Sequence, residues 1–248
     1  MSDEEKEYLS NVFRKFLQVL NAVNDNCVMK INERGLEFVS IDDNHICLAE
    51  AFISREAFPK WKVIKESYAS INLGLIKKIF VSNTLIEGVK QNNNSEMEIF
   101  VGNPLKISLL IRSDLENEDI DTQIKHATNG TIFFEAIIPS KELMILLRRA
   151  KQAFDEISFC VSKGSIICSA SFLNFRILKP LTANITNIRL KSLKFSVPMR
   201  YFSAILPALS LSDKLKISLT DREIVKILLS LNSERYKLSL FISSRIEK

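Results

Sequence analysis

Residues 16–42 read FLQVLNAVNDNCVMKINERGLEFVSID, and residues 146–172 read LLRRAKQAFDEISFCVSKGSIICSASF. In both stretches, apolar residues at helical spacing precede two short runs rich in Val, Ile, Phe and Ser, which is the composition of strands. A glycine lies where the two runs meet, Gly35 in the first stretch and Gly164 in the second. The chain therefore contains one structural pattern twice.

The repeat continues along the sequence. Two further pairs of segments follow in the same order, INLGLIKKIF (71–80) with SVPMRYFSAI (196–205) and PLKISLL (104–110) with IVKILLS (224–230). We infer an α+β fold made of two copies of one unit, in which a helix, antiparallel strands, a second helix and more strands follow one another. The predicted domains are residues 1–115 and 132–248, joined by the polar segment 116–131.

Four segments are predicted to be helical from their apolar spacing, namely residues 10–23, 72–82, 140–153 and 198–210. Ser10 and Ser140 are the expected N-caps of the first and third helices. Pro207 is expected to kink or shorten the fourth helix, because proline has no N–H to donate within a helix.

The composition is that of a globular protein, with 46% hydrophobic and 25% charged residues among 248. No apolar run approaches the roughly 18 residues that span a membrane, and the acidic start MSDEEKEYL does not resemble a signal peptide. The four cysteines have no CxxC spacing, so we expect buried free thiols and neither a zinc site nor a redox motif. We expect an intracellular protein without a membrane partner.

Basic residues occupy the polar faces of all four predicted helices, and Glu142 is the only acidic residue within those spans. The basic residues are Arg14, Lys15, Lys77, Lys78, Lys141, Arg148, Arg149, Lys151 and Arg200. A chance excess of charge in a chain of net charge +5 is the alternative explanation. Solvated helix faces usually mix both signs, so this segregation favours a polyphosphate partner. No base-reading motif accompanies it, and we expect contacts with the phosphate backbone that do not depend on sequence. Catalytic and nucleotide-binding motifs are absent as well, so we do not expect an enzyme.

The stretch SIDDNHICL (40–48) has two possible interpretations. Asp42, Asp43 and His45 could ligate a metal, which would suggest a small metal-dependent hydrolase. No third ligand cluster accompanies them, and a loop without chemistry is the alternative.

Three segments in the right order resemble the proliferating cell nuclear antigen family of DNA sliding clamps. They are LEFVSIDDNHICLAEAFISREAF (36–58), GNPLKISL (102–109) and YKLSLFISSRIEK (236–248). The resemblance implies three subunits joined head to tail in a ring, with helices on the inner face and sheets on the outer face. Such a ring encircles duplex DNA, is placed on it by a clamp loader, and serves as a processivity factor for polymerases in replication and repair. It implies no cofactor, no metal and no catalysis, and a cytoplasmic location in an archaeon or a nuclear one in a eukaryote.

The resemblance also implies a groove that binds short motifs of polymerases, nucleases and ligases. Its floor would be Ile41, His45, Ile46 and Leu48, and its wall Ile224, Phe241 and Ile242. The subunit contacts would lie near residues 105–112 and 171–179. A homotrimer and a heterotrimer with sister subunits both remain open, as does a checkpoint-type clamp paralogue.

Four departures from the family suggest a specialised paralogue. MSDEEKEYL replaces the usual first strand, Ser243 and Ser244 replace Ala-Pro, and the segment between the domains is short. The chain is also basic, whereas family members are usually acidic.

Overall fold

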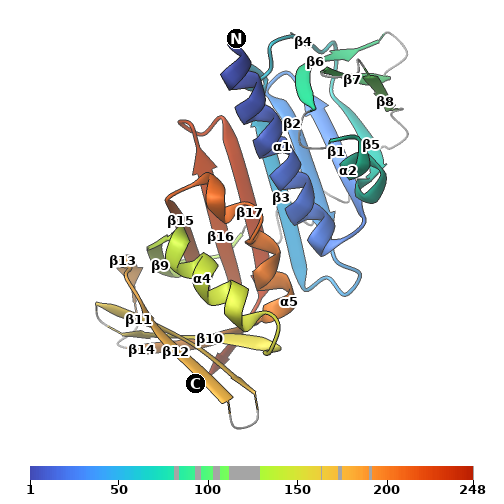
Figure 1. Ribbon diagram of the computed structural model, residues 1–248. Helices are drawn as coiled ribbons and strands as arrows, with labels where there is room; N and C mark the ends of the chain where they lie inside the picture. The colour runs from blue at the N-terminus through green and yellow to red at the C-terminus, as the bar shows by residue number, and fades with distance from the viewer. Residues whose placement is uncertain are drawn as a thin grey trace. The chain divides into compact units, whose positions relative to one another are not determined.

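The computed structural model describes residues 1–80, 84–92, 96–102, 107–111, 129–162, 164–172, 175–189 and 192–247 (Figure 1). The chain divides into two compact units. Unit 1 comprises Met1–Ile41, Ala49–Thr122 and Ser230–Leu238, and unit 2 comprises Asp42–Leu48, Gln123–Leu229 and Ser239–Lys248. The predicted connecting segment 116–131 lies largely outside the described residues. Each unit combines helices with sheets that are antiparallel except for the short β4–β6 pair, which confirms the α+β prediction.

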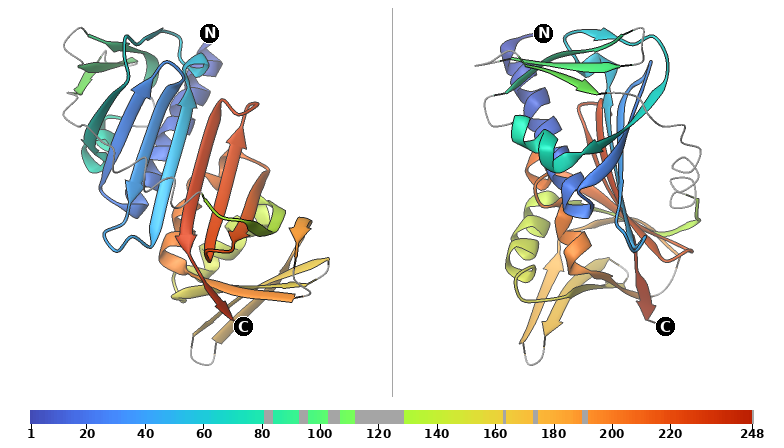
Figure 2. Two further views of the ribbon diagram at one scale, coloured as in Figure 1. Left: turned by 180° about the vertical axis from the view of Figure 1, so that it is seen from behind. Right: turned by 90° about the vertical axis from the view of Figure 1, so that its right-hand side faces the viewer.

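The described residues of unit 1 form two helices and two sheets. The helices are α1 (Asp3–Val23) and α2 (Leu73–Ile79). One sheet has the order β3-β2-β1-β5, with β1 (Asn26–Asn32), β2 (Gly35–Ile41), β3 (Cys47–Ser54) and β5 (Ser67–Asn72). The other has the order β4-β6-β7-β8, with β4 (Trp61–Lys62), β6 (Leu85–Gln91), β7 (Met97–Gly102) and β8 (Ile107–Ile111). Helix α1 lies on β1 and β2, and α2 lies on β1 and β5, on the same face of this sheet (Figure 2).

Unit 2 repeats this plan. Its helices are α4 (Ser140–Ala150) and α5 (Met199–Phe202). One sheet contains β13 (Asn184–Ile188), β9 (Ile132–Pro139), β15 (Lys214–Thr220), β16 (Ile224–Leu231) and β17 (Tyr236–Ser243), in that order. The other has the order β12 (Phe175–Leu181), β11 (Ser165–Phe172), β10 (Glu156–Ser162), β14 (Ser192–Pro198) and β18 (Arg245–Glu247).

The two copies match in element order, but two of the predicted correspondences are wrong. Asn32 pairs with Gly35 across the β1–β2 turn, and Ser162 pairs with Ser165 across the β10–β11 turn. Gly35 therefore corresponds to Ser165 and not to Gly164. PLKISLL contributes to β8, the third strand after α2, whereas IVKILLS lies in β16, the second strand after α5. Short apolar strands resemble one another in sequence, so only the hydrogen-bond register distinguishes them.

Helix α1 begins seven residues earlier than predicted, at Asp3. Ser2 and Glu5 form a reciprocal capping box, in which the Glu5 N–H donates to Ser2 Oγ (3.2 Å) and the Ser2 N–H donates to Glu5 Oε2 (2.7 Å). The prediction that Ser10 is the N-cap is therefore wrong. The added turns are acidic, so Glu142 is not the only acidic residue in the helices. Acidic residues suit this position because the helix dipole favours negative charge at the N-terminus.

Ser10 instead lies buried within α1 and contacts the edge of β6. Its Oγ donates to the Lys6 carbonyl (2.7 Å) and accepts from the Ile86 N–H (2.9 Å). In unit 2, the equivalent edge of β15 pairs with β9 over its whole length. In unit 1, α1 replaces that strand, which confirms that MSDEEKEYL is no strand. Among the described strands, only the two-residue β4 lies along this edge, where Lys60 O accepts from the Val89 N–H (2.9 Å).

The helices of unit 2 differ in two details from the prediction. Ser140 is the first residue of α4, and its buried hydroxyl has no hydrogen-bond partner, so it does not cap the helix. Helix α5 has only one turn and continues as 3-10 turns at Ser203–Ile205 and Leu209–Leu211. This confirms that the helix containing Pro207 is shortened.

Each unit has an aromatic cluster in its core. In unit 1, the Phe13 ring lies 5.7 Å from Phe38 and 4.6 Å from Phe80. In unit 2, Phe159 stacks on Phe195 at 5.0 Å and meets Phe202 edge-on at 5.3 Å. These contacts fix each helix on its sheet. No helix in the described part of the chain is long and apolar enough to cross a membrane.

Replacing Ser10 with Ala tests the edge of β6. The buried Ile86 N–H would lose its acceptor, and we expect a loss of about 1–3 kcal/mol in the free energy of unfolding, measured by urea denaturation. Ser70→Ala, at an exposed position of β5, is the control and should change that free energy by less than about 0.5 kcal/mol. Equal effects of the two substitutions would show that the Ser10 hydroxyl does not stabilise the fold as the acceptor for the Ile86 N–H.

Candidate partner-binding loop and basic helix faces

The Asp42 carboxylate organises the loop that joins β2 to β3. Its Oδ1 accepts from the N–H groups of Ile46 (2.7 Å) and Cys47 (2.6 Å). Its Oδ2 accepts from the Asn44 N–H (3.1 Å) and from the Tyr201 hydroxyl on α5 (2.5 Å). The side chain is only 3% exposed. Four donors thus converge on one carboxylate and fix the loop.

The environment of Asp42 keeps it ionised at neutral pH. Burial raises the pKa of the carboxyl group, but the hydrogen bonds from Tyr201 and the three backbone N–H groups lower it by more, so the net pKa is below its ordinary value. Burial and the adjacent Asp42 carboxylate raise the pKa of Tyr201. The Tyr201 hydroxyl therefore keeps its proton and acts as the donor.

This arrangement does not support the metal-dependent hydrolase. Both oxygens of Asp42 face donors of the protein, whereas Asp43 and His45 are exposed. Within the described ranges, no group of three or more His, Cys, Asp and Glu residues could hold a metal ion. His45 has a positive φ of 55°, an uncommon conformation for a residue other than glycine. The Asp42 carboxylate therefore serves to hold the conformation of the loop.

Two other segments of unit 2 meet this loop. The Ser243 N–H donates to the Ile46 carbonyl (2.9 Å), which places the end of β17 beside the loop. The Ser244 N–H (2.8 Å) and Oγ (2.6 Å) both donate to the Glu223 carbonyl, which brings in the start of β16. The structure thus brings together six of the seven residues predicted for the groove, His45, Ile46, Leu48, Ile224, Phe241 and Ile242. Ile41 belongs to unit 1 and is half-buried.

The six residues differ in exposure. His45 is exposed, and Ile46 and Ile224 are half-buried, so these three can contact a partner. Leu48, Phe241 and Ile242 are buried and support the surface from below. The Lys226 ammonium lies 5.0 Å from the centre of the Phe241 ring. Sequence reasoning missed Lys226 and the organising roles of Asp42 and Tyr201.

The four basic residues predicted for unit 1 lie on α1 and α2. Arg14 and Lys15 are half-buried in the middle of α1, where Arg14 Nη2 donates to Asn11 Oδ1 (3.0 Å). Burial, and then the neighbouring Arg14 charge, lower the pKa of Lys15. Lys77 and Lys78 are exposed on α2, and Lys77 Nζ donates to Asn21 Oδ1 on α1 (3.2 Å). This bond joins α2 to the C-terminal part of α1.

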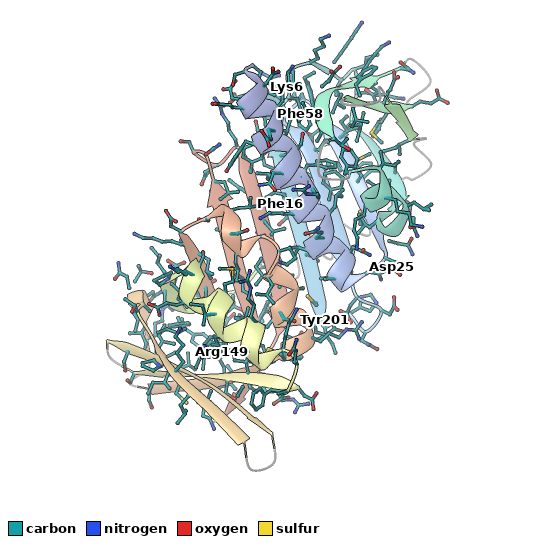
Figure 3. The ribbon with its side chains drawn as sticks, in the orientation of Figure 1. Lys6, Phe16, Asp25, Phe58, Arg149 and Tyr201 are labelled. Carbon is teal, nitrogen blue, oxygen red and sulfur yellow. The ribbon has the colours of Figure 1, made fainter. Side chains whose placement is uncertain are left out.

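The five basic residues predicted for unit 2 are all exposed. Lys141, Arg148 and Arg149 lie on α4, Lys151 caps its C-terminus, and Arg200 lies on α5. Figure 3 shows Arg149 on α4 and Tyr201 on α5. Glu142 is engaged elsewhere, because its Oε2 accepts from the Thr182 N–H (2.9 Å), a bond that lowers the pKa of the carboxyl group.

The comparisons with known proteins agree with this geometry. Residues 4–126 match the family described as "Proliferating cell nuclear antigen, N-terminal domain". The chain is 21% identical to "Proliferating cell nuclear antigen 2" of Plasmodium falciparum over 84% of its length and 83% of the relative's. It is also 21% identical, with the same two shares, to "DNA polymerase sliding clamp" of Thermoplasma acidophilum.

The chain belongs to the proliferating cell nuclear antigen family of sliding clamps. The crystal structure of a PCNA2–PCNA3 complex from Sulfolobus tokodaii contains a chain that is similar in fold, with a TM-score of 0.77 at 14% identity. The similarity covers 95% of this chain and 96% of that one, so the clamp fold extends over both units.

Asp42→Asn tests the loop of this clamp chain. We expect a loss of about 1.5–3 kcal/mol in the free energy of unfolding near neutral pH, because hydrogen bonds to a charged acceptor are replaced by weaker ones. The folded-state pKa of Asp42 lies below the value of about 3.9 for an unfolded Asp. Its contribution is therefore complete above that value and decreases as the pH falls through the folded-state pKa.

The difference between wild type and Asp42→Asn should accordingly shrink below about pH 4 in urea unfolding curves. Asp43→Asn, at the exposed neighbouring position, provides the control. A difference that does not change with pH would show that the Asp42 charge is not what stabilises the loop.

Proposed function

We propose that the chain is one subunit of a ring that encircles duplex DNA and tethers replication and repair enzymes to it. The observation that carries this proposal is the basic helix pair in each repeated unit of a sliding-clamp fold. Two units that each present cations on their helices suit a ring whose helices line the hole. The proposal assigns the chain a binding function and no catalysis.

The DNA contact is proposed to be electrostatic and independent of sequence. Seven of the nine cations are exposed, and all are lysine or arginine, which bind phosphate. Affinity of this kind comes from release of condensed counterions, and it therefore falls as salt rises. A ring that makes only such contacts can slide, because no position along the duplex is preferred.

Ring closure is proposed to use two sheet edges. Among the described strands, β8 ends the sheet β4-β6-β7-β8, and β12 ends the sheet β12-β11-β10-β14-β18. These are the strands predicted around 105–112 and 171–179, and Leu178 of β12 is 55% exposed. Edge-to-edge pairing of unlike strands is heterologous and closes into a ring at a suitable angle. The ring could be a homotrimer or include sister subunits, as in the Sulfolobus complex of two different chains.

Partner enzymes are proposed to bind at the loop of residues 42–48. His45, Ile46 and Ile224 offer an apolar surface with a hydrogen-bonding rim, which suits a helical turn with apolar anchors. Ser243 is exposed where the family pattern has alanine, so one side of this surface is more polar. We therefore expect weaker or more selective binding of polymerase, nuclease and ligase motifs. A clamp loader is expected to use the same face.

Reversal of four helix cations tests the DNA contact. Replacing Lys77, Lys78, Arg148 and Arg149 with Glu should weaken binding to short duplexes equally for all sequences, in fluorescence anisotropy at low salt. The slope of log affinity against log salt should fall by up to about 3.6, about 0.9 for each lost phosphate contact.

The matched control reverses four exposed lysines outside the helices, Lys60, Lys62, Lys65 and Lys214. This variant carries the same change in net charge and should bind nearly as wild type. Equal losses in both variants would mean that net charge, and not the helix faces, governs binding.

Ile46→Asp tests the partner surface. Full burial of an Ile side chain contributes roughly 1.5–3 kcal/mol, so we expect at least about a tenfold loss of affinity for a clamp-binding peptide in calorimetry. Ile64→Asp places the same charge on an exposed Ile of unit 1 and should leave the affinity unchanged. Peptide binding that is insensitive to Ile46→Asp would remove the loop from the proposed function.

A further inference from the structure

Helix α5 contributes one residue to each of the two functional surfaces of unit 2. Arg200 is exposed, and its guanidinium lies 5.3 Å from the centre of the Tyr201 ring. Tyr201 is only 4% exposed, and its hydroxyl donates to Asp42. One turn of helix thus connects a basic face with the loop of residues 42–48.

The anchor for Tyr201 is rigid. The Met199 N–H donates to the Asp155 carbonyl (2.6 Å), which fixes the start of α5 beside β10. Phe202, the next residue after Tyr201, packs edge-on against Phe159 of β10. The position of the Tyr201 hydroxyl is therefore set by the core of unit 2.

The loop depends on a donor from outside itself. All the other donors to Asp42 are N–H groups of residues 44–47, which move with the loop. They determine the loop's internal shape, whereas the Tyr201 hydroxyl at Asp42 and the Ser243 N–H at the Ile46 carbonyl attach the loop to the rest of unit 2. The Tyr201 hydroxyl is the side-chain donor to Asp42 that comes from a distant part of the chain, 159 residues away.

We propose that Tyr201 is the positioning residue of the partner-binding surface: its hydroxyl holds Asp42, and through Asp42 it places Ile46 beside Ile224 for an incoming peptide. This inference rests on the proposed function of the loop. Without the hydroxyl, Asp42 Oδ2 keeps only the Asn44 N–H, and the loop keeps its turn but loses its attachment to α5. Binding a peptide must then restore the loop position. The free energy needed for this reduces the binding free energy, so the affinity decreases.

Tyr201→Phe removes the hydroxyl and keeps the ring. We expect about a tenfold loss of affinity for a clamp-binding peptide in calorimetry, since a buried charged acceptor loses its partner. Tyr68→Phe is the matched control, because the Tyr68 hydroxyl donates to the exposed Glu66 in unit 1 (2.9 Å). That variant should bind as wild type. Circular dichroism at the binding temperature confirms that both variants are folded.

Two further readouts separate positioning from a general loss of stability. Hydrogen exchange at the Ile46 and Cys47 amides should accelerate in Tyr201→Phe, while exchange in β10 and β14 stays unchanged. In a double-mutant cycle, Tyr201→Phe should reduce peptide affinity less when Asp42 is already Asn than it does in the wild type, because both substitutions weaken the same Tyr201–Asp42 bond. Additive losses, or uniform acceleration of exchange, would overturn the proposal.

Ile46→Asp in the same assay distinguishes a failure of the Tyr201 positioning role from a failure of the proposed peptide-binding surface. If Ile46→Asp abolishes binding and Tyr201→Phe binds as wild type, the positioning role is wrong and the binding surface stands. If neither substitution changes the affinity, the proposed function of the loop fails, and this inference fails with it.

Discussion

Backbone N–H and C=O groups along a sheet edge require partners, and this requirement explains much of the chain's architecture. Unit 2 satisfies the outer edge of β15 with a complete strand, β9. Unit 1 has an additional length of helix in place of that strand, so the Ser10 hydroxyl and the Lys60 carbonyl satisfy β6 instead. Among the described strands, β8 and β12 each form the end of their sheet. They are the edges proposed to join subunits head to tail.

A second consequence concerns how distant segments build one surface. The loop of residues 42–48 follows β2 of unit 1 in sequence, yet its contacts assign it to unit 2. The bonds from Tyr201 to Asp42 and from Ser243 to Ile46 account for that assignment. A peptide bound at this loop would therefore contact a surface whose shape depends on the core of unit 2.

The sequence predicted most of the helical framework, because helices are encoded by local spacing. Helix α4 begins at the predicted residue and ends three residues before the predicted end. Helix α1 was predicted too short, because Ser10 resembles an N-cap, whereas the true signal is the Ser2–Glu5 capping box at the start of the chain. The match of PLKISLL with IVKILLS failed because apolar strands resemble one another in sequence. They are distinguished by the strands with which they pair, and that pairing joins residues distant in sequence.

The candidate site was predictable only in part, because a local motif marks the loop but contacts between distant residues shape it. The motif around SIDDNHICL identified the loop, but the role of Asp42 depends on Tyr201, and no local pattern connects residues 159 positions apart. Burial of Phe241 and Ile242 also follows from sheet packing and not from composition, since apolar residues at the end of a strand can face either side.

Light scattering of the purified chain tests most directly whether the two edges join subunits into a ring. The chain alone, or mixed with sister clamp subunits of the same organism, should form a species of about three times the 28.3 kDa of one subunit. A chain that stays monomeric by itself and in every such mixture would contradict the claim.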